Sequence, residues 1–389
     1  MYKVILIYSG HMIDYLQGIV SGLSNEKFLV DIIDAKRKDG SIRIPNKCEN
    51  ITLYKYLDKT KPTTLFWLSL TWSVYYFRLI KHIILSDAKI VHIEWINHRN
   101  RIFEEYILTT IYKLLRKKIV FKVHDLNTKA LLAKKKNFQN EVPKSKSYFL
   151  NRVDIFFVHN NYVKNILINS GINENKIKIT PQGVYNYVVP KGINSIVSKS
   201  KFNIPSNAKT ILFFGNISPY KGFDNLLAIF SRLSEKIKDV YLLVGGNFRK
   251  EHNEYREQIV KKISKMDKAR LRINFKFIPE DEVEYYFAAA DVLCLPHLFI
   301  NQSGVPFLSY AFGLPIFARN VGGLSEDIIV NKTGMIFNDD EELYKLLCDF
   351  YEGKLELLSK DELIKYTKEK FSWDKITSKY IDYYKEVLN

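Results

Sequence analysis

The first half of the chain alternates short apolar runs with segments in which apolar residues recur at helical spacing. The runs at 3–8, 28–33, 89–93, 119–123 and 154–158 predict strands. Between the first two runs, residues 11–23 place Tyr15, Leu16 and Ile19 on one face, which predicts a helix. Strands that alternate with helices are typical of βαβ units, so we expect a largely parallel sheet.

The second half repeats this pattern after a segment, 186–206, that is rich in Pro, Ser, Lys and Gly and predicts a linker. Helices are predicted from Lys221 onward and over 251–266, 305–312 and 373–388. The predicted strands are 210–214, 240–244, 273–277, 292–295 and 314–318. We therefore expect an α/β fold with two Rossmann-like domains, 1–190 and 205–372, that face each other across a cleft.

Composition narrows the class of protein. A chain of 389 residues is long enough for two or three domains. Its three cysteines are scattered, which argues for a reducing compartment and against a disulfide framework or a zinc cluster. The apolar run within residues 1–10 is too short for a signal peptide, and no uncharged stretch is long enough to span a bilayer. We expect a cytoplasmic protein.

The net charge of +17 favours anionic partners such as nucleic acid, anionic lipid or phosphorylated substrates. Richness in Lys, Asn and Ile is also typical of proteins from AT-rich genomes. The sequence has no zinc-finger spacing and no aromatic RNP-like pattern, so we expect no nucleic-acid partner. Residues 63–85 combine aromatic side chains with Arg78, Lys81 and His82. They predict either a core helix with one basic edge or a helix that lies on an anionic membrane.

Two loops in the second half follow predicted strands and carry glycine. The first, 214–222, leads through Gly215 to Lys221 and thus offers a cation and free amides to a pyrophosphate. The second, 301–304, leads into an apolar helix, where Ser303 and Gly304 would let a phosphate approach the backbone. Ligands of open α/β sheets bind outside the carboxyl ends of strands. We therefore expect an anionic ligand at these loops.

In the first half, His124 directly follows the predicted strand 119–123. This position places it at the rim of the sheet, where a binding role and an ordinary loop position are both open. Asp125 is placed either to orient His124 or to cap the residues that follow. The acidic runs 280–284 and 339–342 lack a D-x-D pattern and fit helix starts, so we expect no metal.

The stretch 291–334 resembles the C-terminal half of the retaining glycosyltransferases with the GT-B fold (glycosyl transferases group 1, family 4-like). The resemblance rests on Gly-Leu-Pro at 313–315, Gly-Gly-Leu-Ser-Glu at 322–326 and Thr-Gly at 333–334. The chain departs from the family where two glutamates are usual, because Ile300 and Leu308 occupy those places. The arginine that usually precedes Lys221 is also missing, and Arg319 is a candidate replacement. The loop 302–305, Gln-Ser-Gly-Val, resembles a version found in some branches of the family.

The resemblance implies roles for the candidate residues and for the two domains. The first domain would bind the acceptor, helix 373–389 would pack back on it, and the second would bind a nucleotide-sugar. No metal or other cofactor is implied. The implied residues are His124 and Asp125 for catalysis; Lys221, Gly215, Ser218, Ser303, Gly304 and Gly10 for the donor phosphates; Asn301 and Gln302 for the donor sugar; and Phe277 and Ile278 for the nucleobase.

The implied activity is transfer of a hexose, with retention, from a UDP- or GDP-sugar to an acceptor hydroxyl. The acceptor would be a glycan or lipid-linked glycan of bacterial cell-surface polysaccharide or glycolipid assembly, reached at the inner face of the membrane. Two alternatives stay open. The missing glutamates and arginine favour a non-catalytic GT-B protein that binds a glycan or a partner enzyme. A sugar-nucleotide epimerase would release a changed sugar without an acceptor.

Overall fold

A computed structural model describes residues 2–8, 13–24, 28–35, 50–57, 65–96, 102–124, 147–185 and 191–389 of the chain. The chain divides into two compact units. Among the described residues, unit 1 comprises those up to Gly183 together with Phe371–Asn389, and unit 2 comprises Val184–Lys370. The C-terminal segment therefore belongs to the same unit as the N-terminal half.

Unit 1 is built on a seven-stranded sheet with the order β3-β2-β1-β4-β5-β6-β7, in which neighbouring strands are parallel. Successive strands are added on one side of β1 and then, from β4 onward, on its other side. The topological switch point therefore lies between β1 and β4. The strands are β1 Lys3–Tyr8, β2 Leu29–Ala35, β3 Ile51–Leu57, β4 Ile90–Ile93, β5 Lys118–Val123, β6 Ile155–Val158 and β7 Ile177–Ile179.

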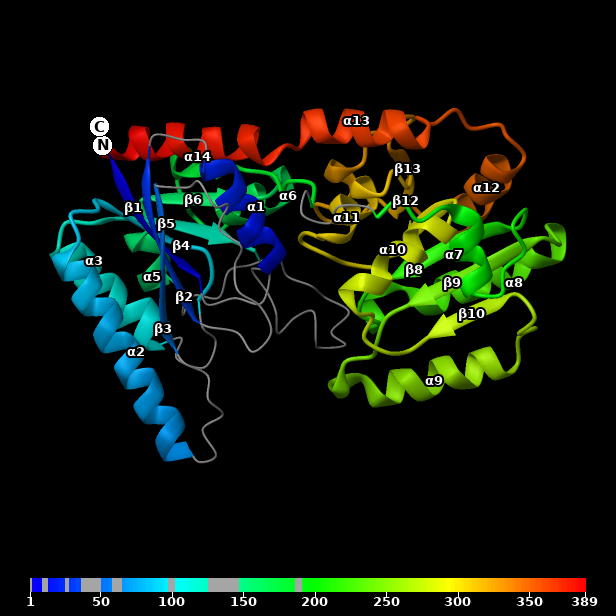
Figure 1. The fold of residues 1–389 in the computed structure, drawn as a ribbon, viewed down its shortest axis with the longest axis horizontal. Coiled ribbons are helices and arrows are strands. Elements are labelled where there is room, and N and C mark those ends of the chain that lie inside the picture. Colours follow the sequence, from blue (N-terminus) through cyan, green and yellow to red (C-terminus); the bar gives the residue numbers. More distant parts are fainter. Residues whose placement is uncertain are drawn as a thin grey trace. The chain divides into compact units, whose positions relative to one another are not determined.

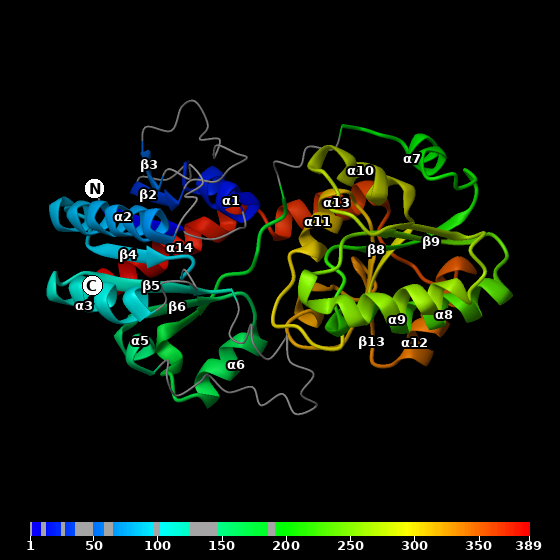
Figure 2. The same cartoon turned by 90° about the horizontal axis from the view of Figure 1, so that it is seen from below.

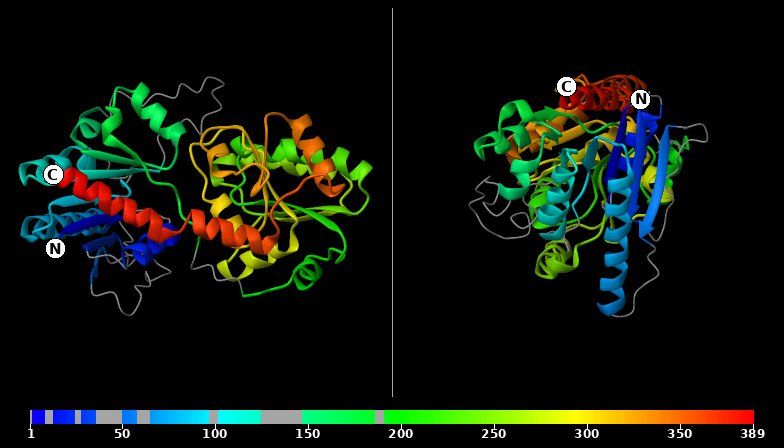
Figure 3. Two further views of the ribbon diagram at one scale, coloured as in Figure 1. Left: turned by 90° about the horizontal axis from the view of Figure 1, so that it is seen from above. Right: turned by 90° about the vertical axis from the view of Figure 1, so that its left-hand side faces the viewer.

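Helices cover both faces of this sheet (Figures 1 and 2). α1 (Ile13–Leu23) and α14 (Trp373–Leu388) share a core on one face, where α14 is the C-terminal red helix in Figure 3. α2 (Leu65–Leu85) and α3 (Thr109–Leu114) pack on the other face. The remaining helical segments are η2 Phe103–Leu108, α5 Ser147–Arg152, α6 Asn161–Asn169 and η4 Glu174–Lys176.

Two glycines let α14 approach the rest of unit 1. A Cβ atom added at Gly18 of α1 would lie 2.0 Å from Cε2 of the Trp373 ring, and one added at Gly183 would lie 2.5 Å from the same atom. No side chain larger than hydrogen fits at either position unless the indole moves. The fully buried Trp373 thus anchors the start of the C-terminal helix.

Unit 2 contains a six-stranded sheet with the order β10-β9-β8-β11-β12-β13, again with parallel neighbours. The chain adds β9 and β10 on one side of β8 and then crosses to its other side with β11. The switch point of this sheet therefore lies between β8 and β11. The strands are β8 Lys209–Phe214, β9 Val240–Gly245, β10 Leu271–Asn274, β11 Val292–Leu295, β12 Ile316–Arg319 and β13 Gly334–Phe337.

Both faces of the second sheet are also covered. α8 (Phe223–Lys236), α9 (Asn253–Ser264) and α12 (Asp340–Tyr351) share the core of one face. On the other face Phe287 of α10 packs on Phe214 and stacks on Phe312, with ring centroids 5.0 Å apart in both pairs. The remaining helical segments are α7 Ser195–Lys201, η5 Pro219–Lys221, η6 Lys250–His252, α10 Glu280–Ala289, α11 Val305–Ala311, η7 Ser325–Asp327 and α13 Lys360–Lys370.

The prediction of an α/β fold with two Rossmann-like domains is confirmed, whereas several single elements differ. The pattern does not predict β3, β7 or β13, which are edge strands and are partly exposed. The predicted linker 186–206 contains α7, whose N-cap Asn194 accepts a hydrogen bond from the Val197 N–H. The predicted strand 273–277 is shifted, since β10 ends at Asn274.

The helix predicted from Lys221 begins two residues later, at Phe223. Lys221 instead ends the short 3-10 turn η5, and the next residue, Gly222, has a φ of 63°. This left-handed conformation separates the turn from α8 and suits glycine. Lys221 therefore belongs to a 3-10 turn in the connection that follows β8 and not to α8.

Candidate functional site

The loops after β8 and β11 lie side by side at the switch point of the second sheet. The Leu298 N–H donates to the carbonyl oxygen of Tyr220 at 2.7 Å. A Cβ atom added at Gly222 would lie 2.0 Å from the Pro296 carbonyl oxygen, so this contact requires glycine. A Cβ atom added at Gly215 would lie 3.8 Å from Cγ2 of Val305, the first residue of α11. We call the joined loops 215–222 and 296–305 the unit 2 site.

Lys221 and His297 form the polar centre of the unit 2 site. Nζ of Lys221 lies 2.7 Å from Nε2 of His297, and the two residues are 7% and 1% exposed. Burial, followed by the charge of Lys221, holds the pKa of His297 well below its usual range. The imidazole is therefore neutral, and its Nε2 accepts the hydrogen bond from the lysine.

The surroundings of Lys221 disfavour its positive charge. Burial, with a further contribution from the guanidinium of Arg249, lowers the pKa of Lys221 to about 7. Arg249 lies in the loop after β9, which is joined to the β8 loop because the Ile217 N–H donates to the Asn247 carbonyl oxygen at 2.8 Å. Within the part of the chain that the structure describes, no carboxylate forms an ion pair with Lys221. An anion beside Lys221 would favour its charged form.

Residues 301–304 lead from β11 into α11 within the same site. Asn301 and Ser303 are buried, whereas Gln302 and Gly304 are half-buried. The Ser303 hydroxyl oxygen accepts a hydrogen bond from the Val305 N–H at 3.3 Å and so pairs a free N–H group at the N-terminus of α11. The contact between Gly215 and Val305 brings this segment to the β8 loop. The structure thus places the predicted phosphate-binding residues of the two loops in one site.

Four further candidates are Ser218, Phe277, Ile278 and Arg319. Ser218 is fully buried, and its hydroxyl has no hydrogen-bond partner among the described residues. Ile278 is buried and Phe277 is 76% exposed, and both follow β10, which β9 separates from β8. Arg319 is ion-paired with Asp340 and also donates to the Asn338 carbonyl oxygen at 3.0 Å. Two of its three guanidinium nitrogens are thus already engaged, and the described cation that acts on Lys221 is Arg249.

In unit 1, His124 lies at the carboxyl end of β5 and is 9% exposed. Its Nε2 lies 3.1 Å from Oε2 of Glu94, and its Nδ1 lies 3.1 Å from Nε2 of His159. Glu94 directly follows β4 and His159 directly follows β6, so three adjacent strands bring these side chains together. The predicted Asp125 and Gly10 lie outside the described residues.

More polar side chains are buried on the same face of the first sheet. Nζ of Lys122 donates to the carbonyl oxygen of Thr180 at 2.6 Å and to its hydroxyl at 2.7 Å. Burial lowers the pKa of Lys122 to about 7, although the charge of Glu94 acts in the opposite direction. Nδ1 of His92 lies 2.5 Å from the Tyr384 hydroxyl, so the C-terminal helix contributes to this cluster.

The sequence analysis singled out His124 and Lys221 but missed Glu94, His159 and His297. Glu94 and His159 each stand directly after a buried strand, as His124 does, and His297 follows β11 and Pro296. Polar residues at the carboxyl ends of adjacent parallel strands meet at one edge of the sheet. The positional rule that selected His124 would have found Glu94 and His159 if applied to every predicted strand, whereas His297 stands one residue further from its strand.

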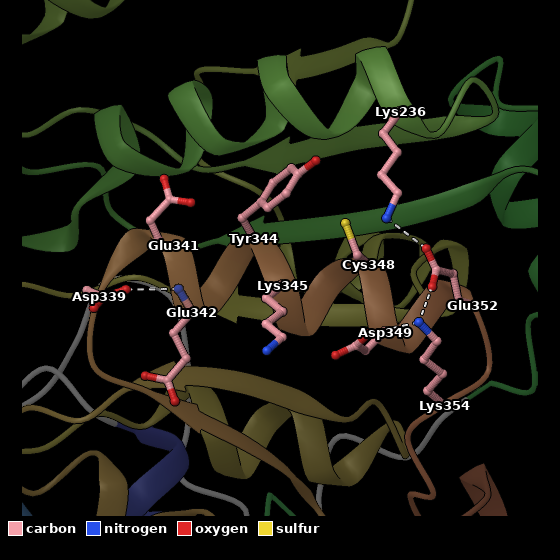
Figure 4. A pocket seen from close by; sticks show the side chains of 10 residues that line it. All are labelled: Lys236, Asp339, Glu341, Glu342, Tyr344, Lys345, Cys348, Asp349, Glu352 and Lys354. Atoms are coloured by element: carbon pink, nitrogen blue, oxygen red, sulfur yellow. Dashed lines mark hydrogen bonds and ion pairs between the residues drawn. The ribbon is translucent and has the colours of Figure 1, made fainter.

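A cavity of about 670 Å³ lies along α12, but its lining residues do not include the loops after β8 and β11. Figure 4 shows acidic and basic side chains that pair with each other, among them Lys236 and Lys354 with Glu352. The charges of Lys236, Lys354 and Glu352 are thus paired within the protein.

Two further observations concern metals and membranes. The described residues hold no cluster of three or more His, Cys, Asp and Glu side chains that could bind a metal ion. None of the described helices combines the length and the apolar character that a bilayer crossing requires.

Comparisons with known sequences show a family to which the second unit is similar. Residues 195–370 match the family model "Glycosyl transferases group 1". An uncharacterized glycosyltransferase of Haemophilus influenzae is 31% identical over 181 residues, which are 44% of this chain and 48% of that protein. The chain thus spans about half the length of this curated relative.

Solved structures resemble the chain over nearly its whole length. A glycosyltransferase from Rickettsia africae has a TM-score of 0.70 at 18% identity and covers 100% of this chain and 99% of its own. HepE of Anabaena, solved in complex with UDP and glucose, has a TM-score of 0.71 at 13% identity. The match covers 99% of this chain and 100% of the HepE chain. At such identities the likeness concerns the fold. The chain therefore has the GT-B fold, and its residues 195–370 are similar to the glycosyl transferases group 1 family.

Proposed function

We propose that this protein is a glycosyltransferase that moves a hexose from a nucleotide diphosphate-sugar to an acceptor hydroxyl, with retention. The observation that carries the proposal is the pair of Lys221 and neutral His297 at the switch point of the second sheet. Lys221 is buried there beside the charge of Arg249 and has no described carboxylate partner, so the site is short of negative charge. A diphosphate supplies that charge and, as the leaving group, gains more during the reaction.

In this proposal the unit 2 site binds the donor. Lys221 neutralises the diphosphate, and Arg249 acts as a second cation in place of the missing arginine. Backbone groups around Gly215, Ser218, Ser303 and Gly304 approach the phosphates, a role also proposed for Gly10. Asn301 and Gln302 bind the donor sugar, while Phe277 and Ile278 bind the base of a UDP- or GDP-sugar. The strong exposure of Phe277, 76%, leaves its ring accessible to a base. No metal takes part in this scheme.

Unit 1 binds the acceptor in the same proposal, and His124, with Asp125, acts in catalysis. The acceptor is a glycan or a lipid-linked glycan of bacterial surface polysaccharide or glycolipid assembly, met by a cytoplasmic protein at the inner membrane face. The outer side of α2 supports the membrane contact. Phe77, Ile84 and Leu85 are 69%, 56% and 73% exposed there, and Arg78 and Lys81 are exposed beside them. Such a face suits an anionic lipid surface.

The test is a transfer and hydrolysis assay with a panel of UDP- and GDP-sugars, run on the wild-type protein, Lys221→Ala and His124→Ala. Lys345→Ala on the exposed side of α12 is the matched control, because it removes an equal charge outside the unit 2 site. We expect turnover that both site variants lose and the control retains. Donor binding without turnover would support a non-catalytic binding protein, and a changed sugar without an acceptor would support an epimerase.

A further inference from the structure

Five side chains of unit 1 form a continuous polar chain, which we call the histidine chain: Tyr384, His92, Glu94, His124 and His159. The Tyr384 hydroxyl lies 2.5 Å from Nδ1 of His92, and Nε2 of His92 lies 3.4 Å from Oε1 of Glu94. Oε2 of Glu94 lies 3.1 Å from Nε2 of His124, whose Nδ1 lies 3.1 Å from Nε2 of His159. The contact between His92 and Glu94 lacks hydrogen-bond geometry and is electrostatic.

The protons of the histidine chain fit one consistent arrangement. Tyr384 keeps its proton, because burial raises its pKa well above the usual range, and it donates to Nδ1 of His92. His92 is neutral, because burial lowers its pKa to about 4, and its remaining proton sits on Nε2, which faces Glu94. His159 is also neutral, since burial holds its pKa well below the usual value.

Glu94 is the anion at the centre of this arrangement. It is 0% exposed, yet its pKa is lowered, because the favourable interactions with His92, His124 and Lys122 together exceed the effect of burial. A buried carboxylate accepts hydrogen bonds only, so His124 must donate from Nε2. In a neutral His124 ring, Nδ1 is then an acceptor, which matches a donating Nε2–H on His159. Every donor in the chain thus points toward Glu94.

We propose that Glu94 is a positioning residue that holds the His124 ring in the Nε2–H tautomer, and that the C-terminal helix keeps Glu94 in place through Tyr384 and His92. The two bonds of the His124 ring then differ in kind. Nε2 is tied to a buried charge, whereas Nδ1 is an acceptor shared with a neutral histidine. A sugar hydroxyl can donate to Nδ1 in place of His159 without disturbing Glu94. The binding of a sugar hydroxyl at Nδ1 rests on the proposed function, whereas the Nε2–H tautomer of His124 does not.

The experiment is long-range ¹H–¹⁵N NMR of the full chain labelled at histidine, which distinguishes the protonated from the unprotonated ring nitrogen. We expect Nε2–H for His124 in the wild-type protein, with assignment from His124→Gln. In Glu94→Gln the carboxylate is replaced by a neutral amide of the same shape, and we expect His124 to move toward a mixture of tautomers. An unchanged Nε2–H population in Glu94→Gln would overturn the proposal.

If Glu94→Gln does not fold, a second pair of variants tests the proposal by the same NMR measurement. Tyr384→Phe removes the hydroxyl at the end of the histidine chain, and we expect shifted ring signals for both His92 and His124. Tyr383→Phe is the matched control, because Tyr383 is half-buried on the same helix and its ring contacts Phe157 and Lys178 instead. Equal spectra for Tyr384→Phe and the control would contradict the role of α14. Absence of sugar transfer in the wild-type protein would contradict the proposed function, but it would not change the NMR results expected for the His124 tautomer.

Discussion

The carboxyl ends of the two sheets each bury a lysine, and the two lysines differ in what surrounds them. Lys122 in unit 1 and Lys221 in unit 2 both have a pKa lowered to about 7 by burial. Lys122 donates to two oxygens of Thr180, and the charge of Glu94 favours its protonated form. Lys221 donates to one neutral histidine, and the charge of Arg249 opposes its protonated form.

This difference separates a self-contained polar cluster from a site that needs a ligand. Buried polar groups are stable where the protein itself supplies their partners. For Lys122, unit 1 meets that condition with the two oxygens of Thr180 and the charge of Glu94. In unit 2, the partner that favours the charge of Lys221 is not among the described residues, which fits an anion that comes from outside.

The strongest test of the difference between the two lysines is to replace each of them with methionine and to measure UDP binding by calorimetry. We expect Lys221→Met to weaken binding about 30-fold or more, because truncating one partner of a buried charge pair costs about 2–5 kcal/mol of binding free energy. Lys122→Met should change binding by less than about threefold, since Lys122 is satisfied within unit 1. Equal losses in both variants would show that the two lysines do not differ in this way.

The number of protons taken up when UDP binds tests the same difference between Lys221 and Lys122. An entering diphosphate favours the charged form of Lys221, so its pKa should rise above about 7 in the complex. Binding should therefore weaken as pH rises from about 7 to 9, by up to about tenfold per pH unit. Calorimetry of UDP binding in buffers of different ionisation enthalpy should show proton uptake at pH 8. Lys221→Arg, which stays charged, should bind without uptake, and uptake by that variant would point to another group.

The closure of unit 1 by α14 can be tested at Gly18. A methyl group at this position would lie 2.0 Å from the Trp373 ring, so Gly18→Ala must displace the indole. We expect a loss of about 1–3 kcal/mol in the free energy of unfolding, as is usual for overpacked cores. Ser21→Ala on the same helix is the control and should lose less than about 0.5 kcal/mol. Urea unfolding followed by tryptophan fluorescence measures both, and unchanged stability of Gly18→Ala would contradict the tight packing.

The two lysines should also make stability depend on pH. Each has a folded pKa near 7 and an unfolded value near 10.5, so between these values the unfolded chain binds more protons. The free energy of unfolding should therefore rise from pH 7 to 9, by up to about 1.4 kcal/mol per pH unit for each lysine. Urea unfolding at a series of pH values measures the slope. Lys122→Met should reduce it, and an unchanged slope would show that Lys122 is protonated in both states.

The smallest expected effect concerns the exposed face of α2. Flotation with vesicles of phosphatidylcholine and about one third phosphatidylglycerol should recover part of the wild-type protein at low salt, since both apolar area and positive charge contribute. Phe77→Ser with Ile84→Ser should reduce that fraction about two- to fivefold, by removing buried apolar area. Val260→Ser, at an exposed position of α9 in unit 2, should not. Wild-type protein that stays in the soluble fraction would exclude the membrane contact.

The sequence by itself determined the two α/β halves and the rim positions of His124 and Lys221. Buried parallel strands need continuous apolar runs, and these are local features that can be read along the chain. The same reasoning failed at β3, β7 and β13, whose edge positions leave them partly exposed, and at Lys221, where the φ of Gly222 delays the helix.

Only the tertiary structure decided which polar groups meet. The contact between His92 and Tyr384 joins residues 292 positions apart, and that between Lys221 and His297 joins residues 76 apart. Such pairs depend on strand order and on the return of α14 to unit 1, which no local pattern specifies. The lowered pKa values follow from the same cause, because burial is a property of the packed molecule and not of the residue.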